Sequence, residues 1–280
     1  MRNRIVIALL LSVLGLSGCR GFLGRGKIVP GKVTFQEAAS ALQTQADEFE
    51  PTQINGTCKL SYRDRDEEGK WRRLPSFTMK FWLEPPYNLC WVGNAAPGPE
   101  GKIFLGANQE AFWLSIKPEI NTYWFGRWDD ATDVTKLELN PRVVLESLGM
   151  IQFAPHESWQ LESKKRVDVL TCRETDSARL IKRLYVTTKT YRLAKIEYYD
   201  ELGEIAVVVE MERYKVLDGK NAVPTGIRVS RHAGGELEGR VTFTLRQGVL
   251  RQFTEKTRAR MFQPITPMGY DRIIPITGSD

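Results

Sequence analysis

Residues 77–84 read FTMKFWLE, and apolar side chains alternate with mostly polar ones along this stretch. Phe77, Met79, Phe81 and Leu83 occupy every second position. Successive side chains of a β-strand point to opposite faces, so this strand would have one apolar face and one mostly polar face. A strand that covers a core with one side only is typical of an antiparallel sheet.

The same alternation returns several times along the chain. A later run places Ile205, Val207, Val209 and Met211 on one face, and residues 227–229 and 241–245 repeat the pattern. Sequences that favour turns separate these runs, at residues 64–69, 106–109, 200–203 and 218–219. We therefore predict a mainly β fold, with about ten strands in a single, strongly curved antiparallel sheet.

Two helices are predicted beside the strands. Thr34 and Glu37 form a capping-box pattern, and the apolar residues that follow recur at helical spacing. Asn140 and Pro141 have the residue types preferred at the cap and first position of a second helix, which would end near Gly149. We expect both helices to pack against the concave side of the sheet, because its apolar face must be covered.

The N-terminus begins with a short basic segment, Met1 to Arg4, followed by an apolar run over residues 5–16. This run is too short to span a bilayer and is typical of a secretory signal peptide. Its end, Leu16-Ser17-Gly18-Cys19, resembles the lipobox of bacterial lipoproteins. The resemblance implies that the chain is cut before Cys19 and that Cys19 carries the acyl groups, such as palmitate, that anchor the protein in a membrane.

These patterns divide the chain into four parts. Residues 1–18 are the predicted signal peptide, and residues 19–32, rich in glycine and basic residues, are the predicted lipidated tether. Residues 33–256 would form the folded domain. Residues 257–280 contain three prolines and predict an irregular tail that covers an edge of the sheet.

Charge and composition exclude some classes of function. The chain has 40 Lys and Arg against 34 Asp and Glu, a net charge of +6, and the two signs are interspersed along the sequence. A nucleic-acid-binding surface is therefore not expected. Besides Cys19 there are Cys58, Cys90 and Cys172, which allow at most one disulfide whose partners the sequence does not identify.

Residues for catalysis or metal binding are scarce. The two histidines, His156 and His232, are far apart in sequence and in loop-like contexts. They supply little material for a catalytic triad or a histidine-based metal site, and the glycine-rich loop that binds phosphate is missing from the sequence. We therefore expect no enzyme activity, no metal and no cofactor.

Four segments, in order, resemble the periplasmic lipoprotein carriers LolA and LolB. They are FWLEPPYNLCW at 81–91, NQEAFWLSIKPEINTYWFG at 108–126, LNPRVVLESLG at 139–149 and AKIEYYDELGEIAVVVEMERYKV at 194–216. The resemblance covers about residues 34–246. It implies an unclosed half-barrel sheet with helices as a lid over an apolar cavity that takes acyl chains.

Alternation and position together suggest which side chains face this cavity. The predicted lipid-binding residues are Phe81, Leu83, Leu89, Trp91, Leu114, Val207 and Val209. One feature departs from the resemblance: where the soluble carrier has an arginine that helps to hold its lid shut, this chain has Glu84 before Pro85. The lid latch is not carried over, and the protruding loop of the membrane-bound acceptor is not recognisable either.

The sequence thus predicts a lipid-anchored monomer that binds acyl chains of a membrane lipid or lipoprotein in envelope lipid or lipoprotein transport. The expected location is the outer membrane, facing the periplasm, with a periplasmic carrier protein as a partner. Two other functions stay open. One is a structural or assembly lipoprotein that acts through protein contacts. The other is an envelope hydrolase, for which Asp129 near Trp124 and Trp128 is the place to look.

Overall fold

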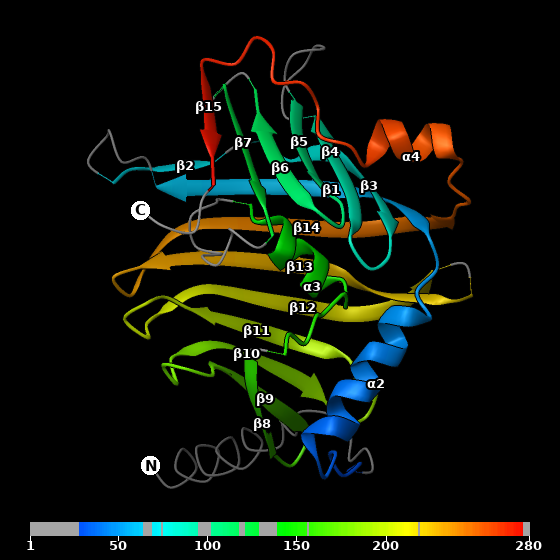
Figure 1. Ribbon diagram of the computed structural model, residues 1–280, viewed down its shortest axis with the longest axis vertical. Coiled ribbons are helices and arrows are strands. Elements are labelled where there is room, and N and C mark those ends of the chain that lie inside the picture. Colours follow the sequence, from blue (N-terminus) through cyan, green and yellow to red (C-terminus); the bar gives the residue numbers. More distant parts are fainter. Residues whose placement is uncertain are drawn as a thin grey trace, which may run out of the picture.

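One sheet organises nearly all of the chain that the computed structural model describes (Figure 1), which comprises residues 28–63, 69–73, 75–94, 102–117, 121–128, 139–155, 157–217 and 219–276. Cys19 and the predicted signal peptide lie outside these residues. So do most of the predicted turn at 64–69, and both Asp129 and His156.

Within the described residues, the sheet contains 15 strands. In chain order they are β1 (Thr52–Arg63), β2 (Trp71–Arg73), β3 (Phe77–Glu84), β4 (Asn88–Asn94), β5 (Lys102–Ala107), β6 (Ala111–Ile116), β7 (Thr122–Arg127), β8 (Glu157–Ser163), β9 (Val167–Glu174), β10 (Leu180–Thr187), β11 (Leu193–Tyr199), β12 (Ile205–Leu217), β13 (Asn221–Ala233), β14 (Glu236–Leu250) and β15 (Arg272–Pro275).

The strand order is β15-β7-β6-β5-β4-β3-β1-β14-β13-β12-β11-β10-β9-β8, with β2 paired to β1 off this path. All pairs are antiparallel except β15 with β7. The two ends, β15 and β8, do not pair, so the sheet is curved but unclosed, as predicted. The estimate of about ten strands was too low. Strands such as β4 are buried on both faces at Leu89, Cys90 and Trp91, which removes the alternation that reveals a strand in sequence.

Three helices accompany the sheet in the described residues: α2 (Phe35–Asp47), α3 (Pro141–Ser147) and α4 (Glu255–Met261). Both predicted caps are present. The Thr34 side chain accepts a hydrogen bond from the Glu37 backbone N–H, and the Asn140 side chain accepts one from that of Arg142. Helix α2 lies against β8, and α3 lies against β5, β6 and β12 on the same side of the sheet (Figure 1). We call this side the core face and the opposite side the outer face.

The main hydrophobic core lies between the core face and these two helices. Leu42 and Ala46 of α2 and Val144 and Leu148 at α3 pack with core-face side chains from both halves of the sheet. A second, small cluster lies on the outer face, where Cys90 is covered by Phe253 and Phe262 from the segments that flank α4.

The segment after residue 256, expected to be irregular, contains ordered structure. It completes α4 and then adds β15 to the edge of the sheet in parallel with β7. The Ile276 N–H donates to the Phe125 carbonyl over 2.7 Å, and the Ile276 side chain is buried in the main core. This segment therefore covers the exposed edge of β7, as its sequence suggested, but it does so as a strand.

Candidate functional site

The seven predicted lipid-binding residues all lie on the core face. Each is at most 3% exposed, and all seven belong to the same hydrophobic core. Phe81, Trp91, Leu105 and Leu114 form one row of cross-strand neighbours over β3 to β6, because each is paired with the next in the ladder. Leu105 was missed by the sequence prediction, although it occupies the middle of this row.

The aromatic rings of this row pack closely against Phe243 of β14. The ring centres of Phe81 and Phe243 are 5.7 Å apart, and those of Trp91 and Phe243 are 5.5 Å apart, both in edge-to-face geometry. Such pairs stabilise a core by about 0.5–1.5 kcal/mol beyond their burial. Val207 and Val209 lie on β12 in the other half of the sheet, where α3 crosses it. The predicted set is therefore continuous apolar lining that spans both halves.

One cavity between the helices and the sheet is small. A cavity lined by Leu42 and Phe49 from α2 and its end, Leu148 and Met150 from α3 and its end, and Tyr214 from β12 has a volume of about 20 Å³. That volume holds at most a water molecule. The predicted acyl-binding residues themselves are buried in the main core, so a ligand that contacts them must displace part of what covers them.

Buried charges join α3 to the sheet within this core. Lys182 Nζ on β10 lies 3.0 Å from Glu146 Oε1 on α3, and both side chains are 4% exposed. Tyr198 on β11 donates from its hydroxyl to Glu146 Oε2 over 2.8 Å. Glu157 on β8 lies 4.0 Å from Lys182, whose ammonium also faces the ring of Trp159 at 5.5 Å.

This cluster was missed by the sequence analysis, although a signal is present. Lys182 occupies a core-facing position between Leu180 and Leu184, where the alternation along the strand predicts an apolar residue. Burial alone would lower the pKa of Lys182, but the carboxylates of Glu146 and Glu157 raise it above its usual value. Lys182 is therefore a buried ammonium beneath α3 whose charge is compensated by the carboxylates of Glu146 and Glu157.

A second ion pair lies on the outer face, at the position where the soluble carrier has its arginine and this chain has Glu84. Glu84 Oε1 accepts from Arg258 Nη2 over 2.8 Å, and Arg258 Nε donates to both oxygens of Glu84. Burial raises the pKa of Glu84, but hydrogen bonds from Arg258 and Asn88 outweigh it and leave the pKa below its usual value. In this protein, the Glu84 carboxylate at the end of β3 therefore holds α4 against the sheet through Arg258.

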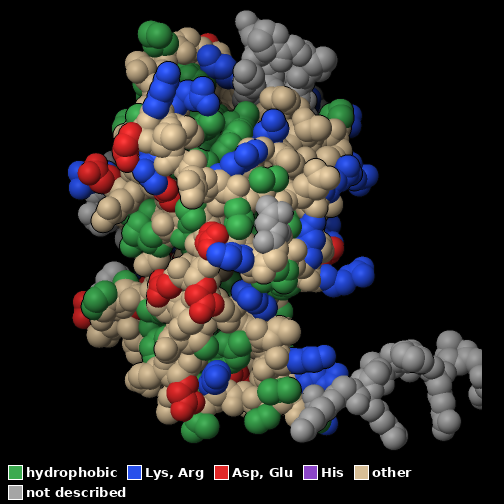
Figure 2. All heavy atoms as spheres, turned by 90° about the vertical axis from the view of Figure 1, so that its right-hand side faces the viewer, with side chains coloured by type: hydrophobic (Ala, Val, Ile, Leu, Met, Phe, Trp, Pro, Cys, Tyr) green, Lys and Arg blue, Asp and Glu red, His purple; other side chains and the backbone are tan. Residues whose placement is uncertain are grey.

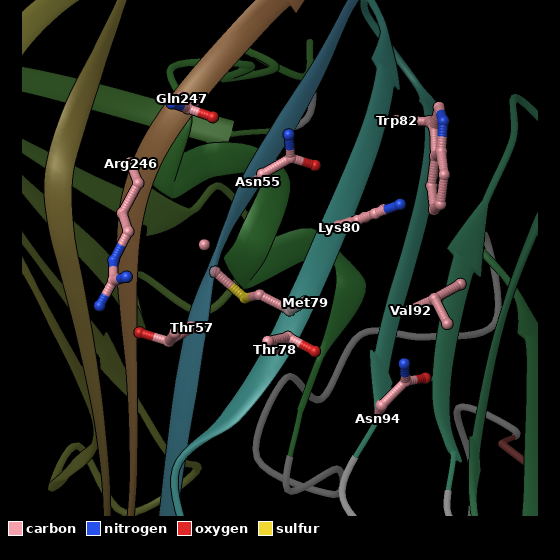
Figure 3. A pocket seen from close by; sticks show the side chains of 11 residues that line it. Asn55, Thr57, Thr78, Met79, Lys80, Trp82, Val92, Asn94, Arg246 and Gln247 are labelled. Carbon is pink, nitrogen blue, oxygen red and sulfur yellow. The ribbon is translucent and has the colours of Figure 1, made fainter. Parts of the chain in front are cut away.

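The outer face also carries an open groove of about 760 Å³ across β14, β1, β3 and β4. It lies where the pairing of β1 with β14 shifts register between Asn55 and Gly56. Figure 3 shows Asn55 and Gln247 toward one end, Thr57, Thr78 and Asn94 toward the other, and Lys80 and Trp82 along one side. Its lining combines the apolar side chains of Met79, Trp82 and Val92 with cations, amides and hydroxyls, and it contains no carboxylate.

The residues that the sequence analysis considered for a metal site, a hydrolase site or a disulfide are each placed by the structure where they are described. Within them, no three His, Cys, Asp or Glu side chains are grouped so that they could hold a metal ion. Trp128, suggested as part of a hydrolase site, packs on Phe112 and donates from Nε1 to the Asn108 carbonyl over 2.6 Å. Cys58, Cys90 and Cys172 are free and buried, and burial raises the pKa of Cys90 to about 12. Such thiols are unreactive.

The described part of the chain also contains no helix that is long and apolar enough to cross a membrane.

An unclosed antiparallel sheet with helices over its apolar face defines a LolA-like half-barrel. The LolA superfamily protein NE2245 from Nitrosomonas europaea has this fold, with a TM-score of 0.51 and 16% identity over 80% of this chain and 97% of that one. A putative outer membrane lipoprotein-sorting protein domain from Vibrio parahaemolyticus is similar, with a TM-score of 0.52 and 12% identity over 79% of this chain and 94% of that one. A DUF1329 family protein from Desulfovibrio piger is also similar, with a TM-score of 0.53 and 11% identity over 80% of this chain and 96% of that one.

No family model matches the sequence, and comparison with curated proteins finds no match. The similarity to the solved structures therefore establishes the fold, and the function is argued from the site.

Proposed function

We propose that this chain is a lipid-anchored protein of the cell envelope that binds the acyl chains of a lipid or lipoprotein on the core face beneath α2 and α3. The observation that carries the proposal is the continuous apolar surface of both halves of the sheet, covered by two helices and not by a second sheet. The description of the similar Vibrio domain as a putative lipoprotein-sorting protein supports it.

Binding would follow displacement of the helices. Burying a methylene group gains about 0.8 kcal/mol, so an acyl chain with about 15 methylenes would gain about 12 kcal/mol on full burial. That gain must offset the exposure of α2 and α3 and the separation of Glu146 from Lys182. Phe81, Leu83, Leu89, Trp91, Leu114, Val207 and Val209 would then contact the chain. Their role is binding and not catalysis.

Anchoring is part of the same proposal. Acylated Cys19 would hold the domain at the outer membrane, facing the periplasm, where a periplasmic carrier brings or removes cargo. The anchor makes diffusion away from the membrane unnecessary, so a monomer that receives cargo at the surface fits better than a soluble shuttle.

A second function is favoured by one observation. The predicted acyl-binding residues are fully buried, and the cavity beside α2 and α3 has a volume of only about 20 Å³, which is also expected of a structural or assembly lipoprotein with a permanently packed core. Such a protein would act through contacts with other envelope proteins.

Native mass spectrometry of residues 20–280, purified gently and without the anchor, distinguishes the two functions. The acyl-binding proposal predicts retained lipid, or uptake of a fluorescent fatty acid after delipidation. A protein that retains no lipid and takes up no probe would contradict acyl binding and favour the structural role.

A further inference from the structure

The N-terminal segment is fixed to one end of the sheet. The Lys32 backbone N–H donates to Asp168 Oδ2 over 2.8 Å, and Tyr191 donates from its hydroxyl to the same oxygen over 3.1 Å. Asp168 is fully buried, and its other oxygen accepts from Ser163. A Cβ at Gly31 would lie 1.9 Å from Asp168 Oδ1, so only glycine allows this approach. The last part of the predicted tether is therefore docked beside β8 and β9.

Basic side chains gather at this end of the sheet. Lys164, Lys165 and Arg166 form the exposed turn between β8 and β9, and Lys189 lies in the turn between β10 and β11. The two turns are adjacent, because the Thr188 N–H donates a hydrogen bond to the Arg166 carbonyl. Glu162 pairs with Lys164 over 3.4 Å. Among described residues, Lys165, Arg166 and Lys189 have no acidic partner.

Apolar side chains are exposed beside these basic turns. Ile28 is 46% exposed, Val29 37% and Val33 86%, although each belongs to a residue type that is usually buried. They flank the docked Gly31 and Lys32. At the lower end of the molecule, where α2 begins near β8 and β9 in Figure 1, Figure 2 shows Lys and Arg side chains next to hydrophobic ones.

The sequence that leads to this end has the same character. Residues 20–30 read RGFLGRGKIVP, with Arg20, Arg25 and Lys27 as the charged residues and no acidic one. Fully extended at about 3.5 Å per residue, this segment reaches no more than about 40 Å from Cys19. The docked residues Gly31 and Lys32 are thus the part of the domain that is tethered closest to the proposed anchor.

We infer that this end, comprising residues 28–33 and the turns at 164–166 and 188–190, is a docking surface for a membrane that contains anionic phospholipids. Basic side chains attract the negatively charged surface, and exposed aliphatic side chains enter the interface between headgroups and acyl chains. Docking would hold the sheet with β8 and β9 toward the bilayer. The inference rests on the proposed anchoring at Cys19, but it does not require that the core face binds acyl chains.

Vesicle partition tests this surface. Residues 20–280, which include every residue that the structure describes, are mixed with phosphatidylcholine vesicles that contain or lack phosphatidylglycerol. We expect partition only to the anionic vesicles and its reversal by added salt. Each basic side chain near an anionic surface strengthens binding about fivefold, so Lys165→Gln with Arg166→Gln lowers the partition coefficient about 25-fold.

A matched variant controls for net charge. Lys59→Gln with Lys256→Gln removes two exposed lysines from β1 and α4, outside the docking surface, and we expect about the same partition as for the unaltered chain. Equal loss in both variants, or binding to neutral and anionic vesicles alike, would overturn the docking surface. Uptake of a fluorescent fatty acid by the same samples reports separately on the core face, so failure of one proposal is distinguishable from failure of the other.

Discussion

Lys182 Nζ lies 3.0 Å from Glu146 Oε1, and this buried pair joins the short helix α3 to the middle of β10. The pair lies in the interior beneath α3, where its polar neighbours are the Glu157 carboxylate and the Tyr198 hydroxyl. Its position means that α3 leaves the sheet only if two opposite charges are separated in a poorly solvated interior. The pair therefore contributes both to the stability of the closed protein and to the energy of opening it.

Breaking the pair from one side is expected to destabilise the fold. Lys182→Met leaves Glu146 buried next to Glu157 without its cation, and we expect the free energy of unfolding to fall by about 3–5 kcal/mol. The double variant Lys182→Met with Glu146→Leu removes both charges and should be more stable than the single variant. Urea unfolding measures both. A double variant that loses the sum of the two single losses would contradict a coupled pair.

Weakening the pair should also favour opening. Glu146→Gln keeps a hydrogen-bonding oxygen but removes the charge, and hydrogen bonds to charged groups contribute about 1.5–3 kcal/mol. We expect a fluorescent fatty acid to associate at least about tenfold faster with this variant, measured by stopped-flow fluorescence. Arg228→Gln, which removes the exposed pair with Glu210, is the control and should leave the rate unchanged. Equal rates in all three proteins would mean that α3 does not limit entry.

The Glu84–Arg258 pair is expected to control access to Cys90. Cys90 is fully buried under Phe253 and Phe262, which flank α4, and Arg258 fastens α4 to the sheet. We expect Arg258→Gln to increase the rate at which a maleimide labels Cys90, because α4 separates from the sheet more often.

Two other thiols provide an internal control for this labelling experiment. Cys58 and Cys172 are buried in strands away from α4, so their labelling rates should not change with Arg258→Gln. If peptide mapping shows that all three cysteines become reactive together, the variant has lost global stability and the local role of the pair is refuted.

The same pair predicts a pH dependence. The pKa of Glu84 in the folded protein lies below its usual value of 4.5, so its contribution is fully present above pH 4.5 and is lost as pH falls through the lower, folded value. We expect hydrogen exchange in α4 to accelerate over this acidic range, relative to the exchange of β13 in the same sample. In Arg258→Gln this difference should be much smaller.

Much of the fold was predictable because its local signals agree with its packing. Thr34 and Asn140 cap helices as expected, and residues 77–84 form a strand with one buried face. Strands such as β4 show no clear alternation, because their second face is also buried, at Cys90, under residues that flank α4. That cover comes from the C-terminal segment, and sequence periodicity contains no information about such distant contacts.

The candidate site was predictable in part, for a related reason. Alternation assigns Phe81 and Leu83 to one face, and the ladder confirms that Trp91 and Leu114 share it. Alternation does not reveal whether that face surrounds a cavity or a packed core, because this depends on where the helices lie. Lys182 violates the pattern of β10, and only its partner on α3 explains why a charge is tolerated there.

Quenching of tryptophan fluorescence by a brominated fatty acid tests the central claim most directly. Trp91 lies on the core face and Trp82 on the outer face, on adjacent strands that pair with each other. If acyl chains bind beneath α2 and α3, the fatty acid quenches the unaltered protein, Trp91→Phe loses a large part of that quenching, and Trp82→Phe retains it. No quenching, or quenching that Trp82→Phe alone removes, would contradict acyl binding on the core face.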